Sequence, residues 1–179
     1  MSGQDFVVPA LSWDQIAQTT DSIREQFGLG AQPYFPIMEF IEKVLDQRMS
    51  VVTFEVADKH EMANAEGYTD PNGEFIILRD DVYYGAYAGD GRSRFTAAHE
   101  LGHLALHTRM PLARARPEQS VPPFCLSEPQ ANQFAAELLM PRCFMMRTDT
   151  AAVVIARHGV SYEAATNRLN FLSRKGLLK

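Results

Sequence analysis

The amino-acid sequence predicts an α+β fold, in which a small, mainly antiparallel sheet packs against two central helices and further helices lie at both ends of the chain. The 179 residues are the length of one domain. Helix-capping residues and helical apolar spacing predict N-terminal helices over 12–48, and short β-branched segments predict the sheet over 50–80. Capping residues recur later, so we expect two helices within 94–141 and a final pair over 149–176.

Composition narrows the class of protein. Apolar residues make up 46% of the chain and charged residues 22%, the balance of an ordinary folded protein. No apolar stretch approaches the roughly 18 residues of a membrane span, and Met1–Asp5 lack the start of a secretory signal. Cys125 and Cys143 are too few for a disulfide framework, so we expect a cytoplasmic protein. A net charge of −5 disfavours general binding of nucleic acid, which depends on neutralised phosphates.

Two helices are expected at the start of the chain. Ser12 and Gln15 have the spacing of a capping box, and Gly28 can adopt the left-handed conformation that ends a helix. In the second segment Pro36 suits the first turn, and an apolar stripe with helical spacing follows it. The stripe consists of Ile37, Phe40, Ile41, Val44 and Leu45.

The strands come next along the chain. Residues 50–56 are rich in β-branched side chains, which favour a strand. Residues 65–68 and 75–78 flank Asp70–Gly73, whose composition predicts a hairpin turn. Residues 85–91 begin and end with glycine, and we expect a loop there before the chain becomes helical again.

A long connection precedes the second central helix. Residues 108–127 contain four prolines and have no periodicity, so we expect a surface loop of the kind that often carries function. Ser127 and Gln130 form a second capping-box pair, which predicts the start of a helix there, and Pro141 ends that helix.

The predicted helices at 149–157 and 161–175 form a pair like a helix–turn–helix, with Gly159 between them. Arg168 and other basic side chains lie nearby, but Glu163 near the start of the second helix would repel a DNA phosphate. The pair is therefore more consistent with a packing element or a partner-docking surface than with DNA binding.

The chemistry is concentrated at His99-Glu100-Leu101-Gly102-His103, which has the pattern H-E-x-x-H on a predicted helix. Residues four apart share one helix face, so both imidazoles can bind one ion. Zn²⁺ suits two imidazoles plus a carboxylate, with a fourth position for water. Glu100 is placed to take a proton from that water, as the base of a hydrolase does. The alternative is a helix whose histidines are merely capped or buried.

A third ligand must come from another segment. His107 lies another turn along the helix, about 12 Å from the level of His99, which is too far for one tetrahedral ion. It is more typical of a helix C-terminus or a pocket wall. The carboxylate candidates are Glu128 and Glu137, which lie on opposite faces of one predicted helix. We favour Glu128; Asn132, four residues on, shares its face and could hydrogen-bond a ligand histidine.

Two blocks of sequence resemble the ImmA/IrrE family of bacterial and phage zinc peptidases. The first is residues 94–107, which include the H-E-x-x-H pattern. The second, more discriminating block is E-x-x-A-N-x-F-A-A-E-L-L-M-P over residues 128–141. The resemblance runs from about residue 74 to the end of the chain. It implies that His99, His103 and Glu128 are the zinc ligands and that Glu100 is the catalytic base.

The same resemblance implies a biological role. Members of the family cleave a DNA-binding repressor at a specific site, usually a small helix–turn–helix protein encoded nearby. They act in phage or mobile-element induction, in stress responses, or in modules of the toxin–antitoxin type. Two alternatives stay open: a non-catalytic partner that sequesters a transcriptional regulator, and a DNA-binding regulator that uses residues 150–176.

Three further expectations concern the surroundings of the site. A phenol of Tyr83, Tyr84 or Tyr87 could hydrogen-bond a developing oxyanion, although aromatic residues beside a sheet are more often core. His158 precedes Gly159 at a helix end, where a positive charge is favourable. A cleft between the sheet edge and the metal helix could bind a substrate as an added strand.

Overall fold

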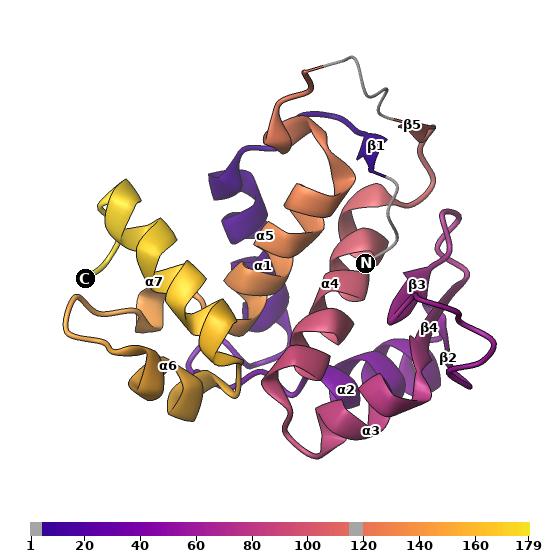
Figure 1. Cartoon of the computed structure of the whole chain (residues 1–179), viewed down its shortest axis with the longest axis horizontal. Coiled ribbons are helices and arrows are strands. Elements are labelled where there is room, and N and C mark those ends of the chain that lie inside the picture. Colours follow the sequence, from indigo (N-terminus) through magenta and orange to yellow (C-terminus); the bar gives the residue numbers. More distant parts are fainter. Residues whose placement is uncertain (1–4, 115–119) are drawn as a thin grey trace.

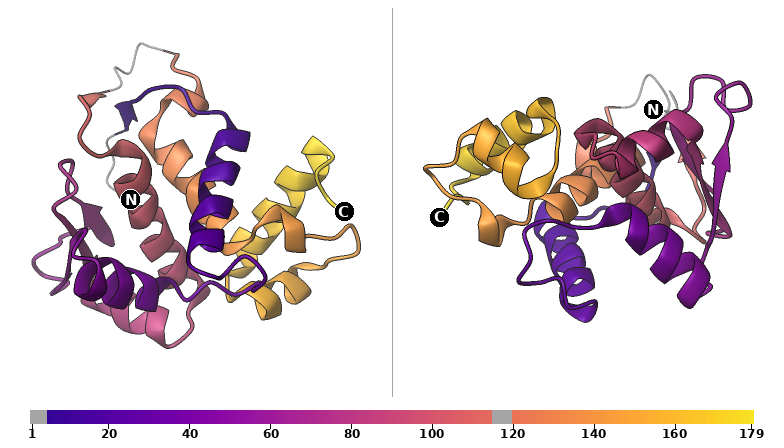
Figure 2. Two further views of the ribbon diagram at one scale, coloured as in Figure 1. Left: turned by 180° about the vertical axis from the view of Figure 1, so that it is seen from behind. Right: turned by 90° about the horizontal axis from the view of Figure 1, so that it is seen from below.

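The computed structural model describes residues 5–114 and 120–179, so residues 115–119 of the predicted surface loop lie outside the described part of the chain. The α+β class is confirmed (Figure 1). Two helices, α4 (Gly91–His107) and α5 (Ser127–Leu139), pack against each other at the centre of the molecule. The sheet lies on one side of this pair and the C-terminal helices on the other, and both views in Figure 2 show the same arrangement.

The N-terminal helix α1 (Trp13–Gln26) begins at the predicted capping box. The Gln15 backbone N–H donates to Ser12 Oγ at 3.2 Å, and the Ser12 N–H donates to Gln15 Oε1 at 2.9 Å. Gly28 has the left-handed conformation expected after the helix, with φ +70°. Local hydrogen bonds thus define the start of α1.

The second helical segment consists of a short α2 (Ile37–Glu39) and a π-helix, η1 (Phe40–Arg48). The predicted stripe faces the core, where Ile37, Phe40 and Ile41 are buried. Phe40 and Leu45 are five residues apart, a spacing that suits the wider π-helical turn. Apolar spacing therefore predicted a helix here but could not show that its hydrogen bonds are π-helical.

The main sheet contains β2 (Thr53–Ala57), β3 (Gly67–Thr69) and β4 (Phe75–Arg79) in the order β2-β4-β3. The predicted hairpin is present, since β3 and β4 pair antiparallel with Tyr68 opposite Ile77. However, β2 pairs parallel with β4, so the sheet is mixed rather than mainly antiparallel. The hairpin partner occupies one side of β4, and β2 docks on its other side; the local sequence of β2 does not specify that direction.

The loop expected at residues 85–91 is largely absent, because α3 (Asp80–Tyr87) extends through Gly85. Two acidic residues in the first turn of α3 favour the helix start. Gly85 is needed for packing, since a Cβ there would lie 2.6 Å from Ser93 Oγ of α4. The glycine therefore marks a close approach between two helices rather than a loop.

The start of α5 also differs from the prediction. Ser127 is already helical and makes no capping box. Its hydroxyl donates to Asp5 Oδ1 at 3.0 Å, and the same oxygen accepts the Glu128 backbone N–H at 3.1 Å. Asp5 precedes β1 (Phe6–Val7), which pairs with β5 (Ala113–Arg114). The cap thus comes from Asp5, which lies 122 positions before Ser127 in the sequence, and local spacing could not reveal it.

The C-terminal helices are α6 (Ala151–His158) and α7 (Tyr162–Lys175), and Gly159 ends the first in the left-handed conformation as predicted. Arg168 is 2% exposed and donates to Glu137 Oε2 and to the Met140 carbonyl. Because its guanidinium lies in the core, it cannot contact DNA in this fold. Arg168 therefore packs α7 against α5, which disfavours the DNA-binding alternative.

His158 lies in the core as well. It is fully buried, and its Nδ1 lies 3.0 Å from the Pro33 carbonyl oxygen. Burial lowers its pKa to about 4, so it is neutral near pH 7. The charged helix-end role expected from its position is therefore wrong. Within residues 5–114 and 120–179, no helix has the length and apolar character needed to cross a membrane.

Candidate metal centre

Helix α4 presents two histidines on one face. Asp90 caps the helix through Ser93 N–H at 2.8 Å. Ala98 and Leu101, which flank the His-Glu pair, are buried in the core and hold the helix in place. His99 and His103 then lie one turn apart, with their Nε2 atoms 2.9 Å from each other. The helical spacing thus produces the paired imidazoles that the sequence predicted.

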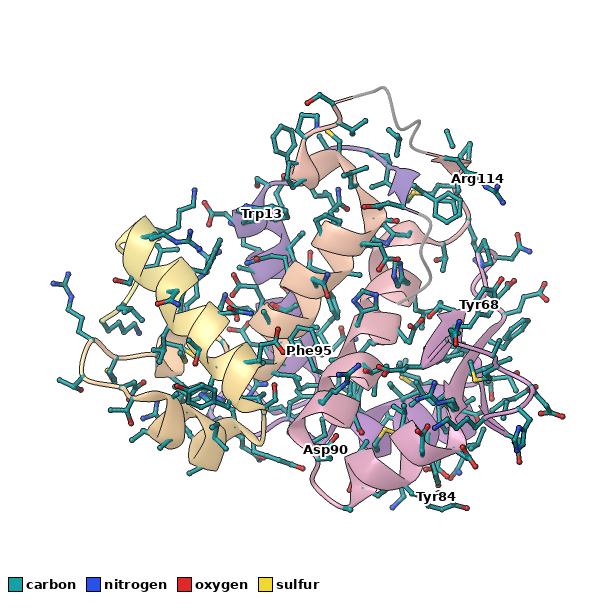
Figure 3. All side chains as sticks on the ribbon, viewed as in Figure 1. Trp13, Tyr68, Tyr84, Asp90, Phe95 and Arg114 are labelled. Atoms are coloured by element: carbon teal, nitrogen blue, oxygen red, sulfur yellow. The ribbon has the colours of Figure 1, made fainter. Side chains whose placement is uncertain are left out.

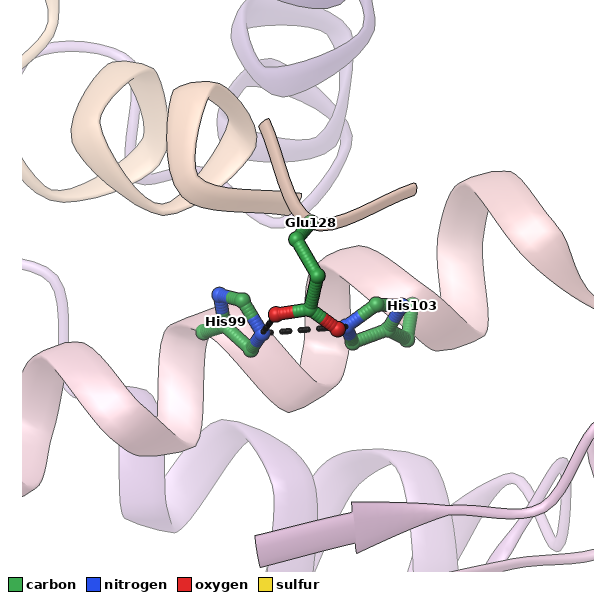
Figure 4. A group of neighbouring side chains, drawn as sticks. All are labelled: His99, His103 and Glu128. Carbon is green, nitrogen blue, oxygen red and sulfur yellow. Dashed lines mark hydrogen bonds and ion pairs between the residues drawn. The ribbon is translucent and has the colours of Figure 1, made fainter. Parts of the chain in front are cut away.

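A close approach between α4 and α5 brings a carboxylate to this pair. A Cβ on Gly102 would lie 3.2 Å from the Ala131 Cα, so glycine allows the two helices to pack closely. Glu128, in the first turn of α5, reaches across to both rings (Figure 4). Its Oε2 lies 3.3 Å from His99 Nε2 and its Oε1 lies 3.4 Å from His103 Nε2.

The three side chains have donor atoms that lie within 4.8 Å of one another and could hold a metal ion. A tetrahedral zinc ion with bonds of about 2.0–2.1 Å would separate its ligand atoms by about 3.3 Å. The distances to Glu128, one from each carboxylate oxygen, are close to this value, and the 2.9 Å separation of the imidazole nitrogens is shorter. Two imidazoles and a carboxylate are also a donor set that zinc prefers. The residues present therefore fit a zinc ion.

Glu137, the rival carboxylate, lies elsewhere. It is 1% exposed, and its carboxylate accepts hydrogen bonds from Arg142 Nε at 3.0 Å and from Arg168. The two glutamates of α5 face opposite directions, as their spacing of nine residues predicted. Glu137 thus joins the helices of the core, and Glu128 faces the histidines.

The site has a strong electrostatic bias towards an ionised carboxylate. Burial alone would raise the pKa of Glu128, but hydrogen bonds from His103 and His99 outweigh it and lower the pKa to about 2. Burial would likewise lower the pKa of His99, and its hydrogen bond to Glu128 together with the charge of Glu100 raises it. Glu128 is therefore negative at neutral pH, as a metal ligand must be.

Two side chains contact the Nδ1 atoms of the ligand histidines, which are the ring nitrogens that do not face the triad. Asn132 Oδ1 lies 3.1 Å from His99 Nδ1, which confirms the expected contact. His107 Nδ1 lies 3.1 Å from His103 Nδ1 and is not part of the triad. His107 is 4% exposed, and burial lowers its pKa to about 4. It is thus a neutral residue beside the triad, and it lines the same pocket, which confirms the pocket-wall expectation rather than that of a charged helix terminus.

Glu100 lies beside strand β3, and its contacts with this strand were not predicted from the sequence. The Thr69 hydroxyl lies 2.8 Å from Glu100 Oε2 and 2.9 Å from the Glu100 carbonyl oxygen. Gly67 provides space for the same side chain, because a Cβ there would lie 2.6 Å from Glu100 Cγ. No local pattern could have predicted these contacts, since they join residues more than thirty positions apart along the chain.

The sequence model of the IrrE N-terminal-like domain, which describes a peptidase family, matches residues 46–170. The chain belongs to this family. The match includes the H-E-x-x-H helix and the Glu128 helix, and it confirms the resemblance to the ImmA/IrrE family. Neither the curated proteins nor the solved structures gave a match.

The triad of this IrrE-like domain opens into a cavity of about 780 Å³. The cavity extends from β3 across α4 to α7, and its lining includes Glu100. Figure 3 shows Tyr68 on the sheet side and Phe95 on the side of α7, and both residues line the cavity. The cleft expected between sheet edge and metal helix is therefore present, and it has an apolar wall at Phe95 and Phe171.

The three tyrosines considered for an oxyanion contact lie elsewhere in the domain. Tyr83, Tyr84 and Tyr87 pack together on α3, and the described lining of the cavity does not include them. The Tyr87 hydroxyl donates to Glu42, and burial raises the pKa of that phenol. The oxyanion hypothesis for these residues is therefore wrong. Tyr83 packs against Phe54 of β2, whereas Tyr84 and Tyr87 are exposed.

Proposed function

We propose that this chain is a zinc-dependent endopeptidase. In this proposal His99, His103 and Glu128 hold the ion, and Glu100 acts as the general base. The observation that carries it is the convergence of Glu128, from α5, on two histidines of α4 at 3.3 and 3.4 Å. Membership of a peptidase family supports the same reaction class.

The residues around the triad have distinct tasks in this reaction. When bound, a zinc ion polarises a peptide carbonyl and lowers the pKa of water. Glu100 accepts a proton from the attacking water and delivers it to the leaving amine. Thr69 donates a hydrogen bond to Glu100 Oε2, which leaves Oε1 free to accept that proton. Asn132 holds His99 in the orientation that presents Nε2 to the ion.

The substrate backbone has a place to bind beside the triad. Strand β3 is at the edge of the sheet, and its residues 67–69 line the cavity. An edge strand offers unpaired N–H and C=O groups, so an extended peptide can add to it as a further strand. Such a peptide would pass next to Glu100, because Thr69 of this strand contacts its carboxylate.

We further propose that the substrate is a small helix–turn–helix transcriptional regulator encoded near this gene. The resemblance to ImmA/IrrE peptidases supports this class of partner, and in this proposal the reaction takes place in the cytoplasm. The setting would be a phage or mobile element, a stress response, or a module of the toxin–antitoxin type.

The test uses the purified chain, zinc and the regulator encoded nearest to its gene, with fragments identified by mass spectrometry. We expect about one zinc ion per chain and one specific cleavage, which a chelator abolishes. Glu100→Gln should keep the zinc and lose about 10²–10⁴-fold in rate, since it removes the base and leaves the ligands. Glu55→Gln, the same change at an exposed residue of β2, is the matched control and should cleave normally.

The alternatives give different results in this experiment. Cleavage by Glu100→Gln at the native rate would refute the catalytic role of this residue. Tight binding of the regulator without cleavage, unaffected by Glu100→Gln, would instead indicate a partner that sequesters the regulator.

A further inference from the structure

His107 contacts the candidate metal centre without belonging to it. It ends α4 and is more deeply buried than His99, at 4% against 8% exposed. Both of its ring nitrogens have partners: Nδ1 lies 3.1 Å from His103 Nδ1, and Nε2 lies 3.0 Å from Gln130 Oε1. A buried imidazole with two defined contacts can exist in only a few protonation states, and its neighbours decide which one.

Gln130 determines the proton position on His107. The side-chain amide nitrogen of Gln130 donates to the Pro9 carbonyl at 2.9 Å and to the Phe124 carbonyl at 2.8 Å. These two acceptors use both amide hydrogens, so the oxygen Oε1 is the atom that faces His107. An amide oxygen can only accept a hydrogen bond. His107 Nε2 must therefore carry a hydrogen.

The next step follows from the burial of His107. Neither of its ring nitrogens contacts a carboxylate, so a protonated ring here would be an uncompensated buried charge. A neutral ring with its hydrogen on Nε2 has a lone pair on Nδ1, which accepts a hydrogen bond. His103 Nδ1 must then be the donor, so Nε2, the atom that faces His99 and Glu128, is the ring nitrogen of His103 that can bind an ion.

We propose that His107 is a positioning residue for the metal centre: held by Gln130, it selects the tautomer and orientation of His103 that leave Nε2 free to bind the ion. A ligand histidine usually donates its outer N–H to a carboxylate, a backbone carbonyl or water. Here a second imidazole fills that role, while Asn132 fills it for His99. The inference rests on the proposed function, because it assumes that the triad binds zinc.

A pair of variants isolates the acceptor. His107→Phe fills the space but removes the acceptor, so it should weaken zinc binding about 10–100-fold. His107→Asn can place an amide oxygen near the position of Nδ1 and should restore most of the affinity. Both variants lose the contact with Gln130, so that contact does not contribute to the difference between them. Zinc affinity is measured by competition with a chromophoric chelator, independently of cleavage.

Equal zinc affinities of the Phe and Asn variants would overturn the proposal, as would native affinity in His107→Phe. A second measurement needs no variant and covers the case in which His107→Phe fails to fold. Nitrogen-15 NMR of the zinc-loaded native protein, labelled at histidine, should show hydrogen on His107 Nε2 and on His103 Nδ1. Hydrogen on His107 Nδ1 would refute the inference and leave the metal site intact, whereas a native protein that binds no zinc would refute the proposed function itself.

Discussion

A single methyl group at Gly67 should displace the catalytic base without touching a metal ligand. The glycine is on β3, opposite the Glu100 side chain, and an alanine Cβ there would lie 2.6 Å from Glu100 Cγ and 2.9 Å from both Cδ and Oε1. Non-bonded carbon atoms pack at about 3.5–4.0 Å. The Glu100 side chain must therefore move by about 1 Å, which also strains its hydrogen bond with Thr69.

The size of the effect follows from this displacement. A misplacement of about 1 Å at a reacting group can cost about 10²-fold in rate, so Gly67→Ala should reduce kcat for cleavage of the regulator about 100-fold. Overpacking costs about 1–3 kcal/mol of unfolding free energy, and the lower end is expected because the carboxylate is the flexible end of a side chain. Zinc content should be unchanged, since the three atoms nearest to the new Cβ all belong to Glu100 and none to His99, His103 or Glu128.

Gly85→Ala provides a matched control. Its new Cβ would also approach a side-chain atom to 2.6 Å, but that atom is Ser93 Oγ, away from the metal centre. The control should lose stability and keep its kcat. Cleavage rate, zinc content and urea unfolding are measured for both variants. Cleavage at the native rate by Gly67→Ala, or an equal loss of activity in both variants, would refute the argument. The position of Glu100 against β3 would then not be required for its role as the general base.

Three further predictions concern buried or distant partners. The pKa of His158 is about 4 in the folded protein and about 6.5 in the unfolded chain. As the pH drops from 6.5 to 4, the unfolded chain takes up the proton first. The free energy of unfolding therefore falls over this range, by up to about 3 kcal/mol. His158→Asn should remove this part of the pH dependence in urea unfolding between pH 7 and pH 4. Asp5→Ala should cost about 1 kcal/mol in thermal unfolding through loss of the α5 cap, while Asp5→Asn retains an acceptor and should cost less. Arg168→Ala should cost about 3–5 kcal/mol because it removes a buried partner of Glu137, whereas Arg174→Ala on the surface of α7 should be neutral.

Much of the candidate site could be predicted because its signals are local. His99 and His103 are four residues apart, and helical geometry alone places them on one face. The same geometry separates Glu128 from Glu137 and aligns Asn132 with the former. Helix ends at Ser12 and Gly159 were also predictable, since the capping hydrogen bonds join neighbouring residues. The residues that form the triad are therefore visible in the sequence.

Contacts between distant segments were not predictable in the same way. Asp5 caps α5 from 122 residues away, so the local pair Ser127 and Gln130 gave a misleading indication. Gln130 instead orients His107, because its amide is held by carbonyls from two other segments. No periodicity or motif encodes which loop passes beside a given side chain.

The sequence by itself determined the helix that carries the paired histidines and the helix that carries the carboxylate, because helical hydrogen bonds and apolar periodicity act over a few residues. It also determined the family, because the residues of its motifs are close together along the chain. Only the tertiary structure decided that Glu128 comes within 3.4 Å of both imidazoles, that β3 holds Glu100, and that β2 runs parallel to β4. These features depend on how closely α4 and α5 pack at Gly102 and on which side of β4 each strand docks. Packing of this kind is settled by the shape of the whole core rather than by any one segment.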